Sequence, residues 1–389
     1  MKLNLSYFGE KKVFSKPKST SNLVKPDVEN YKKYIKNSLN NKNEFYLKEL
    51  FQEKFSELHG TKYCIPVVNG LWALVVAIRL LKIEGKTEVI IPSFTYRRMA
   101  DIAAWLGLTP RFCDVDVNTF SLTKENIEAH INDETAIIIA PHSIVNVCDV
   151  YGIEELSSSK GIPVIFDSVE SYYAEINNKI VGGFGNAEVF SLHASKFMNG
   201  FEGGYITTND DELASNLNII TSGGVVNEKA EIEEFGLDLN LIDYHLAMAL
   251  SCLDDLDSQI IHNKLIYDTY KKLLSRIEGV QLIEYSEIEK RSFKNILIAL
   301  EDTWPIPRNI LIDVLHAENL IVRPYYYPPL HEMTRSYKTI HNHLPNTEYW
   351  KKRLLLMPSG YQVDRGDVYK ICEILEYCQQ NYKDILEQI

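Results

Sequence analysis

The sequence VFSLHASKFMNGFEGG, residues 189–204, gives the strongest local indication of the fold. Two apolar residues lead into Ser191, Lys196 follows five positions later, and a glycine pair precedes the β-rich run that starts at Tyr205. The sequence has no acidic residue within five positions of Lys196. A sequestered lysine without a neighbouring carboxylate favours the neutral, nucleophilic amine. Lys196 is therefore a candidate Schiff-base lysine, although a lone lysine in a loop is most often a solvated surface charge.

The composition is that of an ordinary globular protein, with 389 residues, 45% hydrophobic and 24% charged. At roughly 150 residues per domain, this length indicates two or three domains. The formal net charge of -12 argues against a protein that binds nucleic acid or an anionic membrane, because phosphate groups need clustered Lys and Arg. A local basic patch can still hold an anionic substrate.

The six cysteines are scattered, mostly in apolar runs, and none forms a C-x-x-C pair. This pattern predicts buried structural thiols in place of a zinc site or a redox pair. The N-terminus lacks a long apolar segment, and no later run reaches the ~18 apolar residues that a membrane span needs. We therefore expect a cytoplasmic protein that contacts no membrane and binds no metal.

Buried strands alternate with helices in the first half of the chain. Apolar runs typical of buried strands occupy 63–68, 88–92, 110–115, 136–140, 163–166 and 187–191. Helical spacing predicts helices at 44–58, at 71–81 and from about 97 to 105. Strands that are apolar on both faces and alternate with helices indicate a mostly parallel sheet covered by helices on both sides.

The pattern changes beyond residue 241. A long helical region, with a kink expected along it, runs to about residue 274, and further elements are predicted as strands at 280–283, 296–300 and 320–323 and helices at 309–316 and 368–377. This order predicts a smaller α+β domain. We expect one domain over residues 1–248, whose first 40 residues form an arm on the surface or on a partner subunit, and a second domain over residues 249–389.

Polar residues follow several of the predicted strands, at the edge where parallel sheets bind ligands. Gly70, Tyr96, Asp167 and Ser191 all fall there, and together with Lys196 they point at one crevice. An amine nucleophile, a strand-end acid and an anion-binding turn together suggest pyridoxal phosphate (PLP), whose pyridine nitrogen is kept protonated by a buried carboxylate. Backbone N–H groups at a helix start, with a hydroxyl, suit its phosphate.

Each of these residues also has a simpler explanation. Asp167 can cap a helix. Gly70 can serve a strand-to-helix turn whatever the turn binds, and Tyr96 can be a core or interface aromatic. The individual residues leave these alternatives open.

A family pattern covers nearly the whole chain. The 189–204 stretch resembles the S-x-H-x-x-K…N-x-x-E-G-G signature of the DegT/DnrJ/EryC1/StrS family, PLP-dependent aminotransferases that act on nucleotide-linked keto-sugars. Further matches keep the family order, namely 69–70, 73–74, 91–96, 114–116, 141–142, Asn146, 148–150, 166–168, Gly236, 247–249 and 253–257. The spacing of His142, Asn146 and residues 148–150 is most similar to sugar 4-aminotransferases that make 4-amino-4,6-dideoxyhexoses.

The resemblance implies an α/β fold-type-I PLP enzyme, similar to aspartate aminotransferase. A mostly parallel central sheet then lies between helices, and a smaller α+β domain follows at the C-terminus. In this family pattern Lys196 forms the internal aldimine and moves the proton, while Asp167 pairs with the pyridine nitrogen. His193 has a structural role.

The same resemblance assigns the other contacts of the cofactor. Tyr96 stacks on one face of the pyridine ring and Val169 packs on the other. The Ser191 hydroxyl and the backbone amides of Gly70 and Leu71 bind the phosphate.

The resemblance also implies a reaction. It is the transamination, at C4, of an NDP-4-keto-6-deoxyhexose, with dTDP-4-keto-6-deoxyglucose as the expected substrate and L-glutamate as the donor. Pyridoxamine phosphate is the intermediate form, and the product serves a surface polysaccharide such as lipopolysaccharide O-antigen. Relatives that dehydrate sugars replace the lysine by histidine, so Lys196 argues against that branch.

The resemblance also implies a homodimer, in which the segment around Asp238 completes the site of the neighbouring subunit.

The chain departs from the family pattern at four places. Leu71 stands where Thr is usual, Val145 where Gly is usual, and Glu170 where Gln or His contacts the phenolic oxygen of PLP, so Glu170 needs a proton or a donor neighbour. Asp238 and Asn240 replace an Asn and a basic residue, and an ionised Asp238 would repel the phosphate. These departures motivate an alternative, a non-catalytic or regulatory relative that binds PLP weakly or binds a nucleotide sugar.

Overall fold

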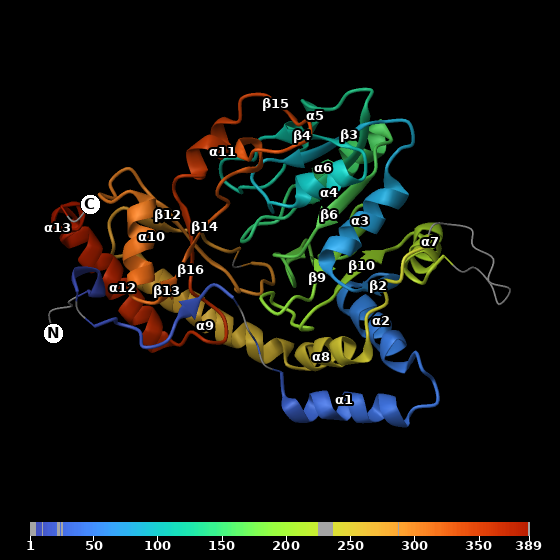
Figure 1. Ribbon diagram of the computed structural model, residues 1–389, viewed down its shortest axis with the longest axis horizontal. Coiled ribbons are helices and arrows are strands. Elements are labelled where there is room, and N and C mark those ends of the chain that lie inside the picture. Colours follow the sequence, from blue (N-terminus) through green and yellow to red (C-terminus); the bar gives the residue numbers. More distant parts are fainter. Residues whose placement is uncertain are drawn as a thin grey trace.

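A mostly parallel sheet forms the centre of the larger part of the molecule (Figure 1). The computed structural model describes residues 5–9, 11–21, 24, 26–224, 236–286 and 288–387. Within them the sheet has eight strands in the order β15-β4-β3-β5-β6-β9-β10-β2. Their bounds are β2 Tyr63–Val67, β3 Glu88–Pro92, β4 Thr109–Cys113, β5 Thr135–Pro141, β6 Val164–Asp167, β9 Ala187–Ser191, β10 Gly204–Thr208 and β15 Ile340–His341. Parallel pairing links β15 through β9, whereas β10 runs antiparallel to both β9 and β2.

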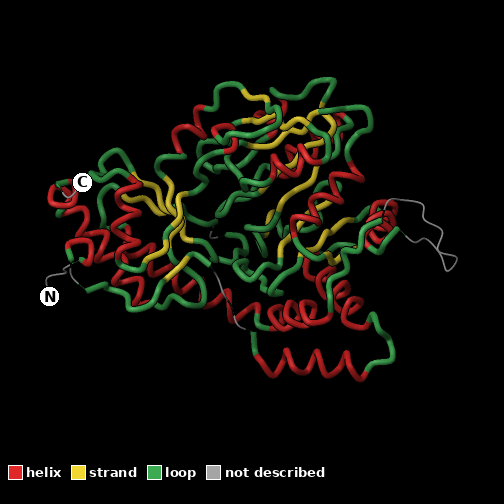
Figure 2. Tube along the Cα trace, viewed as in Figure 1, coloured by secondary structure: helices red, strands yellow, loops and turns green. Residues whose placement is uncertain are grey.

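Helices cover both faces of this sheet, as the sequence predicts (Figure 2). Successive strand residues point to opposite faces, so Ile137 and Ile139 of β5 join one apolar core while Ile138 and Ala140 join the other. The first core contains α3 Gly70–Leu81, α4 Met99–Trp105 and α7 Asp211–Thr221. The second contains α2 Tyr46–His59, α5 Lys124–Glu128, α6 Val150–Lys160 and α8 Asp243–Asp254.

The smaller part of the molecule is built on an antiparallel sheet with the order β11-β12-β16-β14. Its strands are β11 Val280–Leu282, β12 Ile296–Leu300, β14 Arg323–Pro324 and β16 Leu354–Met357, and its helices are α9 Leu256–Leu274, α10 Arg308–Ala317, α12 Arg365–Gln380 and α13 Tyr382–Leu386. The predicted long helical region is α8 followed by α9, and the break falls at Asp255. The short α11 Pro345–Trp350 leads into β16.

The single strand predicted at 320–323 is wrong. The structure has β13 Leu320–Ile321, which pairs with β1 Lys18–Ser19, and a separate β14, which pairs with β16. The chain changes partner because the Val322 amide bonds to the Leu320 carbonyl, and the proline at 324 has no N–H for a longer ladder. The predicted helix at 97–105 likewise begins later, at Met99, after a turn in which the Met99 amide bonds to the Tyr96 carbonyl at 3.0 Å.

The described residues among the first 40 reach both parts of the molecule. β1 extends the smaller part through β13, whereas α1 Val28–Asn40 lies along α8 (Figure 1). The Tyr34 hydroxyl donates to Asp254 at 2.8 Å, and Ser38 bonds to Asp243. The remaining short elements are η1 Ser6–Phe8, β7 Glu175–Ile176, β8 Lys179–Ile180 and η2 Leu330–Glu332.

The cysteines and the helix lengths agree with the sequence-based expectations. All six cysteines are buried and unpaired, which confirms the prediction of buried structural thiols. Among the described residues, every helix falls short of the length or the apolar character that a membrane crossing requires.

A buried carboxylate fixes the strand that leads to the 189–204 stretch. Glu188 of β9 is fully buried and accepts hydrogen bonds from the amides of Gly182 at 2.6 Å and Phe184 at 2.8 Å, and from the Ser168 hydroxyl. Burial raises the pKa of Glu188 to about 7. Ser168 directly follows Asp167, so this carboxylate supports the turn that ends β6.

We expect Glu188→Gln to remove part of the pH dependence of stability. Because the folded pKa exceeds the unfolded value of ~4.3, Glu188 stabilises the fold most below pH ~4.3, and this contribution falls by about 3 kcal/mol as the pH rises through 7. The amide keeps an oxygen for Gly182 and Phe184 and can donate to Ser168 without carrying charge. Thermal unfolding between pH 4.5 and 8 measures the difference.

The surface variant Glu57→Gln is the control for removal of a carboxylate. It is expected to unfold with the wild-type pH profile. Equal pH profiles for wild type and Glu188→Gln would show that the buried carboxylate carries no such penalty.

Candidate active site

The turn that carries Lys196 is closed by backbone hydrogen bonds. It connects the antiparallel neighbours β9 and β10, and the Leu192 amide bonds to the Gly203 carbonyl at 2.8 Å. Within it the Lys196 amide bonds to the His193 carbonyl at 2.8 Å. Gly203 has φ +138°, a conformation that side chains disfavour. The turn therefore holds Lys196 at the carboxyl end of β9, and its side chain is largely buried.

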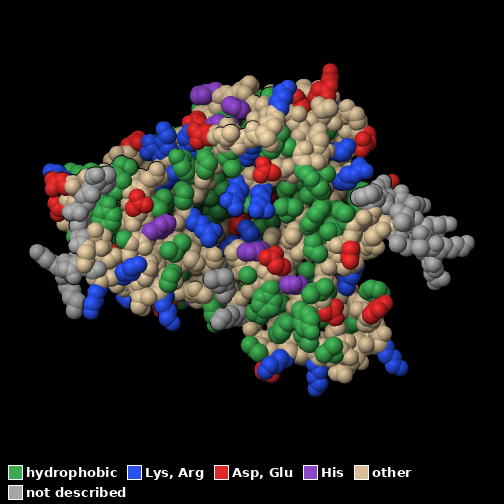
Figure 3. All heavy atoms as spheres, in the orientation of Figure 1, with side chains coloured by type: hydrophobic (Ala, Val, Ile, Leu, Met, Phe, Trp, Pro, Cys, Tyr) green, Lys and Arg blue, Asp and Glu red, His purple; other side chains and the backbone are tan. Residues whose placement is uncertain are grey.

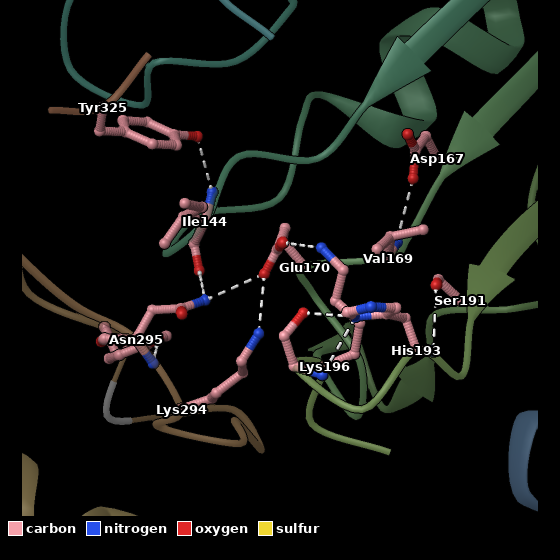
Figure 4. A network of polar contacts seen from close by, with 12 residues as sticks. Ile144, Asp167, Val169, Glu170, Ser191, His193, Lys196, Lys294, Asn295 and Tyr325 are labelled. Carbon is pink, nitrogen blue, oxygen red and sulfur yellow. Dashed lines mark hydrogen bonds and ion pairs between the residues drawn. The ribbon is translucent and has the colours of Figure 1, made fainter. Parts of the chain in front are cut away.

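The Lys196 amine is paired with a carboxylate that lies distant in sequence (Figure 4). Glu170, in the turn after β6, bonds to Lys196 and, at 3.0 Å, to the amine of Lys294. Burial favours a lower pKa for Lys196, but the Glu170 carboxylate outweighs burial and raises the pKa. The expectation of a neutral Lys196 amine is therefore wrong for the protein without its cofactor. Sequence neighbours do not reveal which carboxylate lies close in space.

Glu170 itself is held as an anion. Burial acts to raise the pKa of Glu170, but the two lysines lower it well below its usual range. The donor neighbours that this position needs are thus present, since Asn295 also donates from Nδ2 at 3.5 Å. Burial lowers the pKa of Lys294, and Glu170 opposes that shift.

Asp167 ends β6 as the sequence predicts, and it caps no helix. Its Oδ1 accepts a hydrogen bond from the Val169 amide at 3.1 Å, and turns follow over residues 169–173. Burial raises the pKa of Asp167 to about 6, although the Val169 amide and Lys196 act in the opposite direction. A carboxylate in this environment gains from a buried cationic N–H partner, which is what a protonated pyridine nitrogen offers.

The start of α3 fits a phosphate group. Asn69 caps the helix by accepting from the Trp72 amide at 2.9 Å, so the Gly70 and Leu71 amides lie in the first turn, where helices lack internal acceptors. A Cβ on Gly70 would meet Ser191 Cβ at 2.9 Å, and a Cβ on Gly204 would meet the Gly70 nitrogen at 2.5 Å. Glycine thus brings the helix N-terminus against Ser191, which is an arrangement suited to anions.

Tyr96 and Asp238 are both exposed, and they lie in different surroundings. The Tyr96 side chain is 42% exposed, so it is not a core aromatic, and it lies close enough to Lys196 to contribute to the raised pKa of that amine. Asp238 is exposed, pairs in a bridge with Ser222 and accepts from Asn240 at 3.2 Å. Its segment runs beside the end of β2, where the Val68 amide bonds to the Leu239 carbonyl at 3.0 Å.

Sequence reasoning missed the residues that the smaller part of the molecule contributes. Lys294 and Asn295 approach Glu170, and the Tyr325 hydroxyl accepts from the Ile144 amide at 3.1 Å. A lone lysine before the apolar strand β12 gives no signal of its own. The aromatic run at 325–327, followed by two prolines, is the sequence signal that could have indicated a contribution from this region.

Comparisons with known proteins show the family of the chain. The model of the DegT/DnrJ/EryC1/StrS aminotransferase family matches residues 28–376. GDP-perosamine synthase of Escherichia coli O157:H7 is 29% identical over 324 residues, which cover 83% of this chain and 87% of that protein. The dTDP-4-amino-4,6-dideoxy-D-glucose transaminase of Shigella dysenteriae is 27% identical over 307 residues, which cover 78% and 83%.

A solved structure has the same architecture. DesI, in a crystal structure determined in the presence of its TDP-sugar product, matches with a TM-score of 0.90 at 24% identity, over 99% of this chain and 98% of that chain. The predicted fold-type-I architecture is thereby confirmed. Since the family model spans most of its length, the chain belongs to the DegT/DnrJ/EryC1/StrS aminotransferase family and is an enzyme that depends on pyridoxal phosphate.

Proposed function

We propose that this enzyme transfers the amino group of L-glutamate to C4 of an NDP-linked 4-keto-6-deoxyhexose, and that dTDP-4-keto-6-deoxyglucose is the first substrate to test. The observation that carries the proposal is that Lys196, Asp167 and the start of α3 lie together at one edge of the central sheet. The name of the Shigella dysenteriae relative supports amination at C4. The names of the two relatives carry different nucleotides, dTDP and GDP, so the nucleotide is part of the test.

Bound PLP would supply an electron sink. Asp167 would hold a proton at the pyridine nitrogen, and Lys196 Nζ would take the proton from the α-carbon of the donor and return it. The Gly70 and Leu71 amides and the Ser191 hydroxyl would bind the phosphate. Leu71 offers this site a backbone amide only, because its side chain has no hydroxyl.

One face of the molecule carries basic side chains that suit an anionic substrate. Figure 3 shows Lys and Arg side chains gathered around a hollow near the centre of this face. This local grouping contrasts with the formal net charge of -12. A nucleoside diphosphate carries the charge that such a grouping attracts. A cytoplasmic location and a role in surface-polysaccharide synthesis stay predictions.

A homodimer is part of the proposal, with a site completed by the neighbouring subunit. Apolar side chains are exposed along α1 and α8, including Leu39 at 79% and Tyr244 at 58%. The ring of Tyr31 in α1 meets that of Phe201 edge-on at 6.4 Å, so the apolar surface continues into the Lys196 turn. Contiguous exposed apolar surface is typical of an interface. A second subunit seated there would contact the turn that carries the catalytic lysine.

Lys196→Ala is expected to abolish covalent capture of PLP and to lower transamination by at least about 10³-fold, because the variant lacks both the amine and the proton carrier. Borohydride reduction followed by mass spectrometry locates the cofactor on the wild-type chain. The surface variant Lys62→Ala, which removes a partner of Asp211, is expected to capture PLP as wild type does. Wild-type protein that takes up no PLP would contradict the proposed function.

A substrate panel distinguishes the remaining choices. With L-glutamate and dTDP-, GDP- or UDP-linked keto-sugars, we expect equimolar 2-oxoglutarate and a 4-amino sugar, with ping-pong kinetics. Nuclear magnetic resonance of the product identifies the aminated carbon. Turnover of 3-keto sugars alone, with a 3-amino product, would disprove the C4 assignment and leave the transaminase chemistry intact.

The homodimer is tested by light scattering after size exclusion. Wild type is expected at twice the chain mass, and Leu39→Glu is expected to shift the population toward monomer and to lower activity in proportion. Burying a charge on an apolar interface is the reason. Tyr369→Glu, on the exposed side of α12, is the control and should remain dimeric. A monomeric wild type with full activity would exclude a shared site.

A further inference from the structure

Lys294 is a buried cation that the smaller part of the molecule places against Glu170. Lys294 is 3% exposed, and its amine lies 3.0 Å from Glu170 Oε2. Asn295, the next residue, also reaches this oxygen (Figure 4). The Glu170 carboxylate therefore lies between an amine from the larger part, that of Lys196, and an amine from the smaller part.

The segment that carries Lys294 is anchored on both sides. Arg291 Nη1 donates to the Glu175 carbonyl at 2.6 Å, which ties the segment to the larger part. Phe293 has φ +49°, a strained conformation for a bulky residue, and its ring packs against that of Tyr285 at 5.1 Å. Packing on both sides of this strained position sets the direction in which Lys294 leaves the backbone.

The charge at residue 170 explains why a cation is needed there. In the family pattern a neutral Gln or His at this position contacts the phenolic oxygen of PLP, whereas a carboxylate has no proton to donate. Once the Lys196 amine binds the cofactor covalently, Lys294 is the described lysine that still faces Glu170. An uncompensated buried carboxylate beside a phenolic oxygen is strongly disfavoured.

We propose that Lys294 is a positioning residue for the cofactor, whose ammonium group balances the Glu170 carboxylate beside the phenolic oxygen of PLP. The pair of Glu170 and Lys294 thereby takes the place of the neutral donor of the family pattern. This inference rests on the proposed function. Burial lowers the pKa of Lys294, which adds to the need for an ionised partner.

A double-mutant cycle tests the proposal through PLP affinity. Lys294→Met is expected to weaken PLP binding by about tenfold to a hundredfold, the range for loss of a charged hydrogen bond. In the Glu170→Gln background the same substitution is expected to change affinity by less than about threefold, because the amide carries no charge to balance. Fluorescence titration of the purified chain with PLP gives the four Kd values.

The absorbance of bound PLP provides a second readout. Without Lys294, the negative charge of Glu170 favours protonated forms of the cofactor, so the pH midpoint of the absorbance change is expected to move upward in Lys294→Met. It should return toward the wild-type value in Glu170→Gln/Lys294→Met. A side chain that only fills space would not produce this charge-dependent return.

Matched variants control for folding and for charge. Lys290→Gln removes an exposed lysine from the same segment and is expected to bind PLP as wild type does. Circular dichroism checks each variant, and Lys294→Gln repeats the cycle, so that a folding defect of one substitution leaves the comparison intact.

Two results would overturn the inference. Equal effects of Lys294→Met in the Glu170 and Glu170→Gln backgrounds, with PLP bound by wild type, would overturn it alone. A wild type that fails to bind PLP would overturn the proposed function with it.

Discussion

The parallel strands of the central sheet end at one edge, and the site residues that the larger part contributes depend on this convergence. The register of the ladders pairs Pro141 with Asp167 and Asp167 with Val189, so the turns that follow β5, β6 and β9 are neighbours. The start of α3 reaches the same edge because Gly70 and Gly204 allow backbone contact. An acid, an amine and an anion cradle from separate segments therefore meet without a long loop.

Most of this sheet can be predicted from the sequence, because a strand buried on both faces is a continuous apolar run. The exceptions are short or depend on distant partners. β15 has two residues, Ile340 and His341, and pairs with β4 from the far end of the chain. A two-residue strand has no periodicity to detect, and the division of 320–323 into β13 and β14 is decided by partners that lie hundreds of positions apart or across the smaller sheet.

The candidate site likewise has some features that the sequence predicts and others that it does not. Lys196 and Asp167 are predictable because each follows an apolar strand and belongs to a recognisable local pattern. The charged partners of Lys196 cannot be predicted in this way, because Glu170 is 26 positions from Lys196 and 124 positions from Lys294. The sequence neighbours of Lys196 predict a neutral amine, whereas the Glu170 carboxylate in the turn after β6 raises the pKa of that amine.

The contact between Glu170 and Lys294 also joins the two parts of the molecule at the reacting amine. Removing one partner of a buried ion pair costs more than the intact pair contributes to stability, because the other charge is left buried and unpaired. The segment 291–295 is held against the larger part by Arg291 and against the smaller part by Phe293. Glu170 thus faces the amines of Lys196 and Lys294 at once, and both lower its pKa. The same carboxylate therefore contacts both the reacting amine and a segment that joins the smaller part to the larger one.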